Sequence, residues 1–163
     1  MVVSMEKYSK PMMGTAKVWA EMSYCQRRKV GAVLEKGGRA LNTGYNGTIS
    51  GQANECEEDC SHCDATGEKE GNICPQCQGS KTVTTKTVIH AEKNLIAFCA
   101  KRGIPTDGCT VYVTLSPCVE CASLMKQAGI VRVIYDEKYR DTSGIEFLEE
   151  IGVEVIQYKS INA

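Results

Sequence analysis

The chemistry and fold of this chain follow from two stretches, His90-Ala91-Glu92 and Ser116-Pro117-Cys118-Val119-Glu120-Cys121. Together they offer one imidazole, two thiolates and a carboxylate that is free for other work. A structural zinc is closed by four protein ligands, whereas three ligands leave one position for water and indicate a catalytic zinc. We therefore expect His90, Cys118 and Cys121 to bind the metal and Glu92 to carry protons.

The local spacing agrees with this interpretation. Pro117 suits the first turn of a helix, so Cys118 and Cys121 fall on one face at a helix N-terminus, where free amides and the helix dipole favour thiolate. His90 and Glu92 are two residues apart and do not share a helical face, so one can bind metal while the other reaches the water. Buried thiols, a core histidine or a closed structural zinc are the plainer alternatives. The presence of all four residues in this order favours a catalytic zinc site over these alternatives.

Length and composition limit the class of protein. The 163 residues, 42% of them hydrophobic, predict one domain spanning 1–163. A formal net charge of −1 gives no field that attracts a polyanion, so we expect small molecules and further copies of the chain as partners, and no nucleic acid. We find no signal peptide in the first ten residues and no apolar run of membrane-spanning length, so we expect a cytoplasmic protein without membrane association. Ten cysteines without an export signal predict reduced thiols that bind metal.

Hydrophobic periodicity predicts alternating helices and strands. Helices are expected over 12–24, 90–100, 118–128 and 145–150. Strands are expected over 30–34, 40–45, 109–115, 131–135 and 153–158, the first two joined as an antiparallel hairpin. This order predicts an α/β fold in which one mixed sheet is covered by helices on both faces.

The segment from about 50 to 86 has a different composition, rich in glycine, threonine and acidic residues, and it holds five of the ten cysteines. We interpret it as an insertion that a metal orders, because it has too few apolar residues for a core. Two CxxC pairs predict a closed four-sulfur zinc site made by Cys60, Cys63, Cys74 and Cys77. Cys99 and Cys109 lie in apolar patterns and are predicted to be buried free thiols.

Further strings extend the pattern over most of the chain, at residues 23–33, 38–39, 43–48, 90–94, 112–118, 128–130 and 138–141. With Gly-Tyr-Asn-Gly at 44–47 as the sharpest marker, the chain resembles the deoxycytidylate deaminases of bacteriophage type, within the cytidine and deoxycytidylate deaminase superfamily. One departure is Ile49, which stands where a proline usually follows that string. The resemblance implies a three-layer α/β/α cytidine-deaminase-like fold with a central mixed five-stranded sheet and a zinc-stapled loop insertion.

The resemblance also implies an activity, the zinc-dependent hydrolytic deamination of dCMP to dUMP and ammonia, which supplies dUMP for dTTP synthesis. Glu92 would take a proton from water, pass it to N3 of cytosine and help protonate the leaving amine. The implied substrate contacts are Asn46, Ser116 and Tyr139. The cationic side chains near these strings are candidates for the phosphate, or else solvated surface charges; they are Arg27, Arg28, Lys29, Lys138 and Arg140.

Regulation is implied as well. In this family Gly44, Tyr45, Asn46 and Gly47 would help to form an effector site at subunit contacts of a homo-oligomer, a hexamer, where dCTP with magnesium activates and dTTP inhibits. Taken alone, the string favours a turn. A phage-encoded enzyme would act in the host cytoplasm. Phage relatives bind a structural zinc near the positions of Cys25 and Cys56, so these residues, or His62, are alternatives within the second metal site.

Two other functions fit parts of the pattern. A deaminase acting on a base within RNA or DNA shares the zinc motif, but that class uses basic tracks or aromatic platforms, and only 6% of this chain is aromatic. A catalytically silent zinc-ribbon module would need no Glu92. Both dCMP and a 5-modified dCMP agree with the motif, since pocket shape worth about 1 to 3 kcal/mol decides between them.

Overall fold

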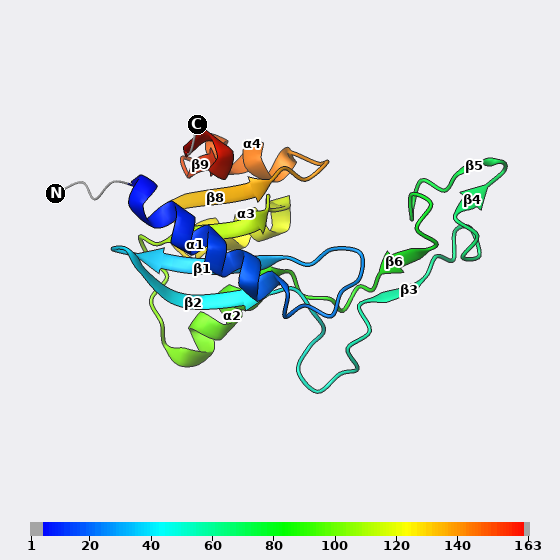
Figure 1. The fold of residues 1–163 in the computed structure, drawn as a ribbon, viewed down its shortest axis with the longest axis horizontal. Coiled ribbons are helices and arrows are strands. Elements are labelled where there is room, and N and C mark those ends of the chain that lie inside the picture. Colours follow the sequence, from blue (N-terminus) through cyan, green and yellow to red (C-terminus); the bar gives the residue numbers. More distant parts are fainter. Residues whose placement is uncertain (1–4, 162–163) are drawn as a thin grey trace.

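The central element is a mixed five-stranded sheet in the order β2-β1-β7-β8-β9 (Figure 1). The structure is a computed structural model that describes residues 5–161, so the ends of the expected domain, 1–4 and 162–163, lie outside the described residues. Strands β1 (Gly31–Lys36), β2 (Arg39–Tyr45) and β7 (Thr110–Leu115) are antiparallel neighbours. Strands β8 (Arg132–Glu137) and β9 (Glu154–Gln157) continue the sheet in parallel with β7.

Helices cover both faces of the sheet, which confirms the expected three-layer α/β/α fold. One core cluster lies between the sheet and α2 (Ala91–Arg102), α3 (Val119–Gln127) and α4 (Ser143–Glu150). The other lies between the sheet and α1 (Met5–Ala20), with the short 3-10 helix η1 (Tyr158–Ile161) beside it. None of the helices within residues 5–161 is long and apolar enough to cross a lipid bilayer.

Strand β7 shows why the sheet sits between two apolar layers. Val111 and Val113 belong to the core under α2, α3 and α4, whereas Tyr112 between them belongs to the core under α1. Successive side chains of a strand point to opposite faces, so a strand buried on both sides must be apolar throughout. The same strand ends at Leu115, directly before the Ser116-Pro117-Cys118 stretch.

Helix α1 differs from the expectation of a helix over 12–24. It begins at Met5, contains Pro11 in its interior and ends at Ala20. A proline inside a helix removes one backbone hydrogen bond and costs roughly 3 kcal/mol, so the local sequence favours a position for Pro11 in the first turn. Met12 and Met13 are buried against the sheet. This packing offsets the local cost, and tertiary contacts therefore extend the helix by two turns before the proline.

Residues 50–86 form an arm that projects away from the body of the molecule (Figure 1). Its stalk is an antiparallel ribbon of β3 (Glu57–Asp59) and β6 (Thr82–Thr84), and its outer part holds the short hairpin β4 (Glu68–Lys69) and β5 (Asn72–Ile73). Apart from Val83, the buried apolar cluster of the arm consists of cysteines. The arm therefore has no apolar core that would order it.

Candidate active site and a second cysteine cluster

Two helix N-termini bring the four expected catalytic residues together. His90 is the N-cap of α2 and Glu92 lies in its first turn, while Cys118 is the N-cap of α3 and Cys121 lies in its first turn. The Nδ1 atom of His90 lies 3.3 Å from the Sγ atom of Cys121 and 3.7 Å from that of Cys118. Residues 28 and 31 positions apart in the sequence thus converge on one point.

The spacing of these atoms fits a zinc ion. With Zn–S bonds of about 2.3 Å and Zn–N bonds of about 2.0 Å, tetrahedral geometry puts nitrogen and sulfur ligands about 3.5 Å apart. The two observed distances, 3.3 and 3.7 Å, lie on either side of that value. Three ligand atoms within 4.8 Å of one another leave a fourth corner open, as in a catalytic site.

The protonation of the two thiols also calls for a cation. Hydrogen bonds from Cys121 and from His90 lower the pKa of Cys118 to about 3, so this sulfur is anionic at neutral pH. The nearby Cys118 sulfur and the burial of Cys121 raise the pKa of Cys121, because a second thiolate beside the first is unfavourable without a compensating charge. A divalent metal supplies that charge and allows both sulfurs to be thiolates.

Glu92 is the buried carboxyl of the site. Its side chain is almost fully enclosed, with 4% relative exposure, and burial raises its pKa above the ordinary value of a glutamate. Burial disfavours the charged form, so this carboxyl takes up a proton more readily than an exposed one. It is not part of the three-residue ligand cluster, which leaves it free to move protons.

A cavity of about 470 Å³ opens in front of these residues. This volume lies in the usual range for small-molecule sites. The cavity lining includes His90, Glu92 and Cys118 together with the three expected substrate contacts, Asn46, Ser116 and Tyr139. The structure therefore gathers the expected catalytic and substrate-binding residues around one cavity.

Ser116 and Tyr139 are linked to each other. The backbone N–H of Tyr139 donates to Oγ of Ser116 at 2.8 Å. Ser116 is buried, and its own backbone N–H donates to the carbonyl of Glu137. The ring of Tyr139 lies under the guanidinium groups of Arg28 and Arg140, each 5.8 Å from its centroid. The tyrosine ring thus keeps two positive charges at the cavity wall.

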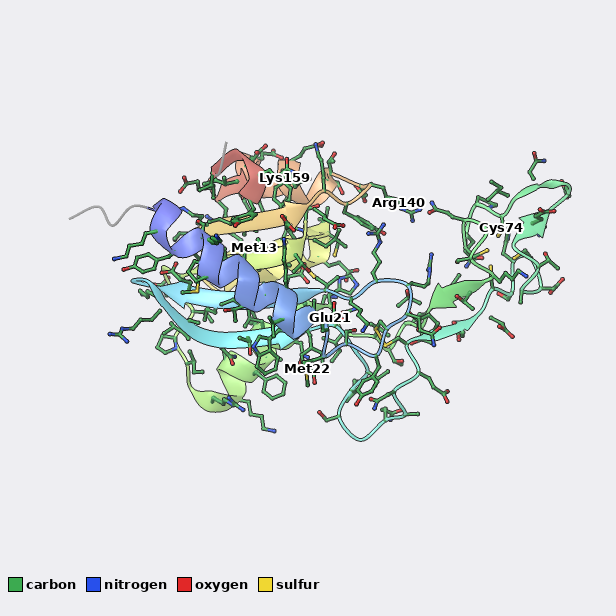
Figure 2. All side chains as sticks on the ribbon, viewed as in Figure 1. Met13, Glu21, Met22, Cys74, Arg140 and Lys159 are labelled. Atoms are coloured by element: carbon green, nitrogen blue, oxygen red, sulfur yellow. A yellow bond between two sulfur atoms is a disulfide. The ribbon has the colours of Figure 1, made fainter. Side chains whose placement is uncertain are left out.

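The five cationic candidates separate into two groups. Arg27, Arg28 and Arg140 line the cavity. Lys29 instead forms a surface ion pair with Glu21 at 3.3 Å. Within residues 5–161, Lys138 does not contribute to the cavity wall. Figure 2 shows Arg140 on the loop that follows β8, on the side of the body from which the arm projects.

The Gly-Tyr-Asn-Gly string adjoins the catalytic helix. A Cβ atom at Gly44 would lie 2.7 Å from the carbonyl oxygen of Ala91, so only glycine lets β2 approach α2 this closely. The side chain of Asn94 donates to the carbonyl of Tyr45 at 2.9 Å. Gly47 and Ile89 exchange two backbone hydrogen bonds of 2.8 and 3.1 Å. These contacts anchor the segment that carries His90.

Asn46, within the same string, holds a loop by its side-chain amide. Its Oδ1 atom accepts from the N–H of Val30 at 2.7 Å, and its Nδ2 atom donates to the carbonyl of Arg28 at 2.8 Å. The amide retains one N–H and one lone pair after these two bonds. Asn46 can therefore contact a ligand in the cavity while it keeps the loop in place.

Four cysteines of the arm form a second cluster. The sulfur atoms of Cys60 and Cys74 are 3.9 Å apart and those of Cys63 and Cys77 are 3.7 Å apart, close to the tetrahedral S–S edge of about 3.8 Å expected around zinc. All four side chains are buried and lie within 4.8 Å of one another. The backbone N–H of Cys77 lowers the pKa of Cys74 to about 7, which favours its thiolate. The set fits a closed zinc site.

Cys25 and Cys56 correct the expectation that all ten thiols are reduced. In the structure they form a disulfide across 31 residues of sequence, with Cα atoms 5.1 Å apart. The loop before β1 contacts the base of the arm through hydrogen bonds to Glu57, and the side chains of Cys25 and Cys56 meet beside these contacts. With both sulfurs used in this bond, neither is an additional zinc ligand in the structure. The free thiols of Cys99 and Cys109 are buried, as expected.

The arm also adds cavity-lining residues that the sequence pattern did not indicate. They are polar, and they include Glu57, Gln76, Gln78, Ser80 and Thr84. The sequence predicts only a metal-ordered insertion for this segment, because no local pattern shows that it faces the expected catalytic residues. Figure 2 shows Cys74 in the outer part of the arm, so the four-cysteine cluster belongs to the same arm as these cavity-lining residues.

Comparison with known proteins agrees with the geometry of the site. The family described as the cytidine and deoxycytidylate deaminase zinc-binding region matches residues 5–137. A deoxycytidylate deaminase of Enterobacteria phage T2 is 34% identical over 173 residues, which cover 88% of this chain and 88% of the phage protein. The chain belongs to the cytidine and deoxycytidylate deaminase family.

Two further proteins are similar to most of the chain. ComE operon protein 2 of Bacillus subtilis (strain 168) is 35% identical over 150 residues, covering 89% of this chain and 68% of that protein. A crystal structure of dCMP deaminase from the cyanophage S-TIM5, in complex with dCMP and dUMP, superposes with a TM-score of 0.72. It is 35% identical and covers 93% of this chain and 96% of its own. These similarities confirm the fold and the expected deaminase family.

Proposed function

We propose that this chain catalyses the zinc-dependent hydrolytic deamination of dCMP to dUMP and ammonia and thereby supplies dUMP for dTTP synthesis. The observation that carries the proposal is the buried carboxyl of Glu92 beside a three-ligand cluster, at the wall of a nucleotide-sized cavity. The similar proteins of phages T2 and T4 are deoxycytidylate deaminases, which supports dCMP as the substrate. The proposed cellular location is the cytoplasm, that of the host if the chain is phage-encoded.

His90, Cys118 and Cys121 would hold the metal. When bound, zinc supplies a Lewis acid that makes water nucleophilic near neutral pH. Glu92 would accept the proton of that water, because its buried carboxyl has a raised pKa and lies off the ligand set. The same carboxyl would pass that proton to N3 of cytosine. It would then move the second proton of the water, from the hydroxyl group added at C4, to the departing amine, which leaves as ammonia.

The other cavity residues would bind and orient the nucleotide. The free N–H and lone pair of Asn46 would contact the sugar, and the backbone near Ser116 would contact the amino group that is lost. Arg27, Arg28 and Arg140 would provide the cationic surface for the 5′ phosphate. Such a surface explains why a nucleotide would be preferred over its nucleoside.

A second zinc would bind Cys60, Cys63, Cys74 and Cys77 and order the arm. The remaining elements of the proposal concern regulation: a homohexamer, activation by dCTP with magnesium and inhibition by dTTP, with Gly44, Tyr45, Asn46 and Gly47 near the effector. The position of this string against α2 supports the proposal, since Gly47 pairs with the residue before His90. A ligand at the string would then act directly on the segment that carries the metal ligand.

The test is ammonia release from dCMP by the purified protein, with dCTP plus magnesium, with dTTP and with neither. We expect turnover that dCTP raises and dTTP suppresses. Turnover without any nucleotide response would contradict the regulation alone. No turnover of dCMP by protein with its full zinc content, in parallel with turnover of a cytidine-containing oligonucleotide, would overturn the substrate assignment.

A further inference from the structure

The loop of residues 23–30, here called the arginine loop, joins α1 to β1 and carries Arg27 and Arg28 into the cavity wall. It contains no helix or strand, so its backbone polar groups need other partners. Side chains supply many of them. Ser23 accepts from the N–H of Cys25 at 3.2 Å, and Asn46 binds the backbone of Arg28 and Val30. The position of both arginines thus depends on these side-chain contacts.

Glu57 supplies the contacts for the middle of the loop. One oxygen of its carboxylate, Oε1, accepts from the backbone N–H groups of Gln26 at 2.9 Å and Arg27 at 3.1 Å. Glu57 is half-buried and opens β3, so it belongs to the arm and lies about 30 residues away in the sequence. Hydrogen bonds from N–H groups to an ionised carboxylate are stronger than neutral ones.

The carboxylate binds the backbone and leaves the guanidinium groups available. Within residues 5–161, neither Arg27 nor Arg28 forms an ion pair with an acidic side chain, and the guanidinium group of Arg28 lies over the Tyr139 ring. Two unpaired cations at the wall of a cavity are suited to an anionic ligand. Glu57 therefore fixes the loop without neutralising the charges that the loop presents.

The arm is built so that Glu57 itself is held firmly. Glu57 pairs with Thr84 of β6 in the ribbon, and the N–H of Thr85 donates to the carbonyl of Cys56 at 2.9 Å. At the other end of the ribbon, the N–H of Cys60 donates to the carbonyl of Lys81 at 2.8 Å. The stalk thus connects the four-cysteine cluster to the arginine loop through continuous hydrogen-bonded backbone.

We propose that Glu57 is a positioning residue for nucleotide recognition: it docks the arginine loop onto the arm and so aims Arg27 and Arg28 at the phosphate. The inference rests on the proposed function. It makes the arm a working part of the substrate site and not merely a surface insertion. A glutamine at position 57 would keep the accepting oxygen, whereas an alanine would remove it.

The experiment compares Glu57→Ala, Glu57→Gln and the matched control Glu58→Ala, which removes an exposed carboxylate from the same strand. All proteins are kept under reducing conditions, so that the Cys25–Cys56 bond does not hold the loop to the arm. The first readout is amide hydrogen exchange at Gln26 and Arg27. We expect it to accelerate about tenfold or more in Glu57→Ala, to accelerate less in Glu57→Gln, which keeps a neutral acceptor, and to stay unchanged in Glu58→Ala.

The second readout separates phosphate recognition from chemistry. In Glu57→Ala we expect KM for dCMP to rise about tenfold with kcat within about twofold of wild type, and kcat/KM for deoxycytidine, which lacks the phosphate, to stay unchanged. Unchanged amide exchange, or an equal loss with both substrates, would overturn the inference. If the wild-type protein fails to deaminate dCMP, the proposed function fails, and amide exchange alone decides whether Glu57 docks the loop.

Discussion

The ammonium group of Lys93 lies 2.6 Å from a carboxylate oxygen of Glu120. Lys93 follows Glu92 on α2, and Glu120 lies between the candidate metal ligands Cys118 and Cys121 on α3. One ion pair therefore joins the two helix N-termini that meet at the catalytic cluster. The hydrogen bond to Glu120 raises the pKa of Lys93 above its ordinary value.

We expect this pair to contribute little to global stability. The side chains of Lys93 and Glu120 are 36% and 77% exposed, and such pairs contribute less than about 1 kcal/mol. A double-mutant cycle of Lys93→Ala and Glu120→Ala in urea unfolding should give a coupling energy in that range, with catalytic zinc retained. Loss of zinc from either single variant would show that the pair is needed to assemble the ligand cluster.

Glu92→Gln should remove turnover and leave the metal in place. Glutamine has nearly the same shape but accepts no proton, and a positioned general base contributes about 10²- to 10⁴-fold to the rate. Zinc content should stay at the wild-type value because Glu92 is outside the ligand cluster. The measurement is ammonia release beside zinc analysis of the same sample. Activity of this variant near the wild-type level would exclude Glu92 as the proton carrier.

Gly144→Ala should disturb the metal site through packing. A Cβ atom at Gly144 would overlap the carbonyl oxygen of Pro117 and lie 2.8 Å from the carbonyl carbon of Cys118. Backbone cannot move away as a flexible side chain can, so we expect a loss of about 1 to 3 kcal/mol in the free energy of unfolding and weaker zinc binding. Urea unfolding and competition with a chelator measure the two effects.

Gly14→Ala is the matched control for that substitution. Gly14 lies within α1, and nothing approaches its Cβ position within 4 Å. Alanine in a helix interior is favoured over glycine by roughly 0.5 to 1 kcal/mol, so this variant should be as stable as wild type or more stable. Equal destabilisation by both substitutions would contradict the role assigned to Gly144.

Cys74→Ser combined with Cys77→Ser should lower the zinc content from two ions per chain to one. The arm has few buried apolar side chains besides its cysteines, so its order should depend on the metal. We expect limited proteolysis to cut within the arm while α2 and α3 stay protected. Cys99→Ala, which removes a buried thiol outside both clusters, should keep both zinc ions. Two zinc ions in the double variant would contradict the four-sulfur site.

Much of the catalytic cluster was predictable because its information is local. Two short spacings predict which side chains lie together at a helix N-terminus, that of His90 and Glu92 and that of Cys118 and Cys121. The alternation along β7 likewise follows from the two-residue period of a strand. The two CxxC pairs of the arm are equally local, and the structure brings their four sulfur atoms together.

Pro11, Cys25 and Glu57 show where local information ends. Pro11 lies inside α1 because the packing of Met12 and Met13 on the sheet offsets the local cost of the proline, and the residue pattern does not show how large that packing energy is. The Cys25–Cys56 bond and the contacts of Glu57 with the arginine loop join segments about 30 residues apart. Such contacts depend on how the arm docks on the body, which is a balance of many weak interactions between distant segments. Residue patterns therefore predict the candidate catalytic groups and their chemistry, whereas three-dimensional packing determines which charges face the cavity.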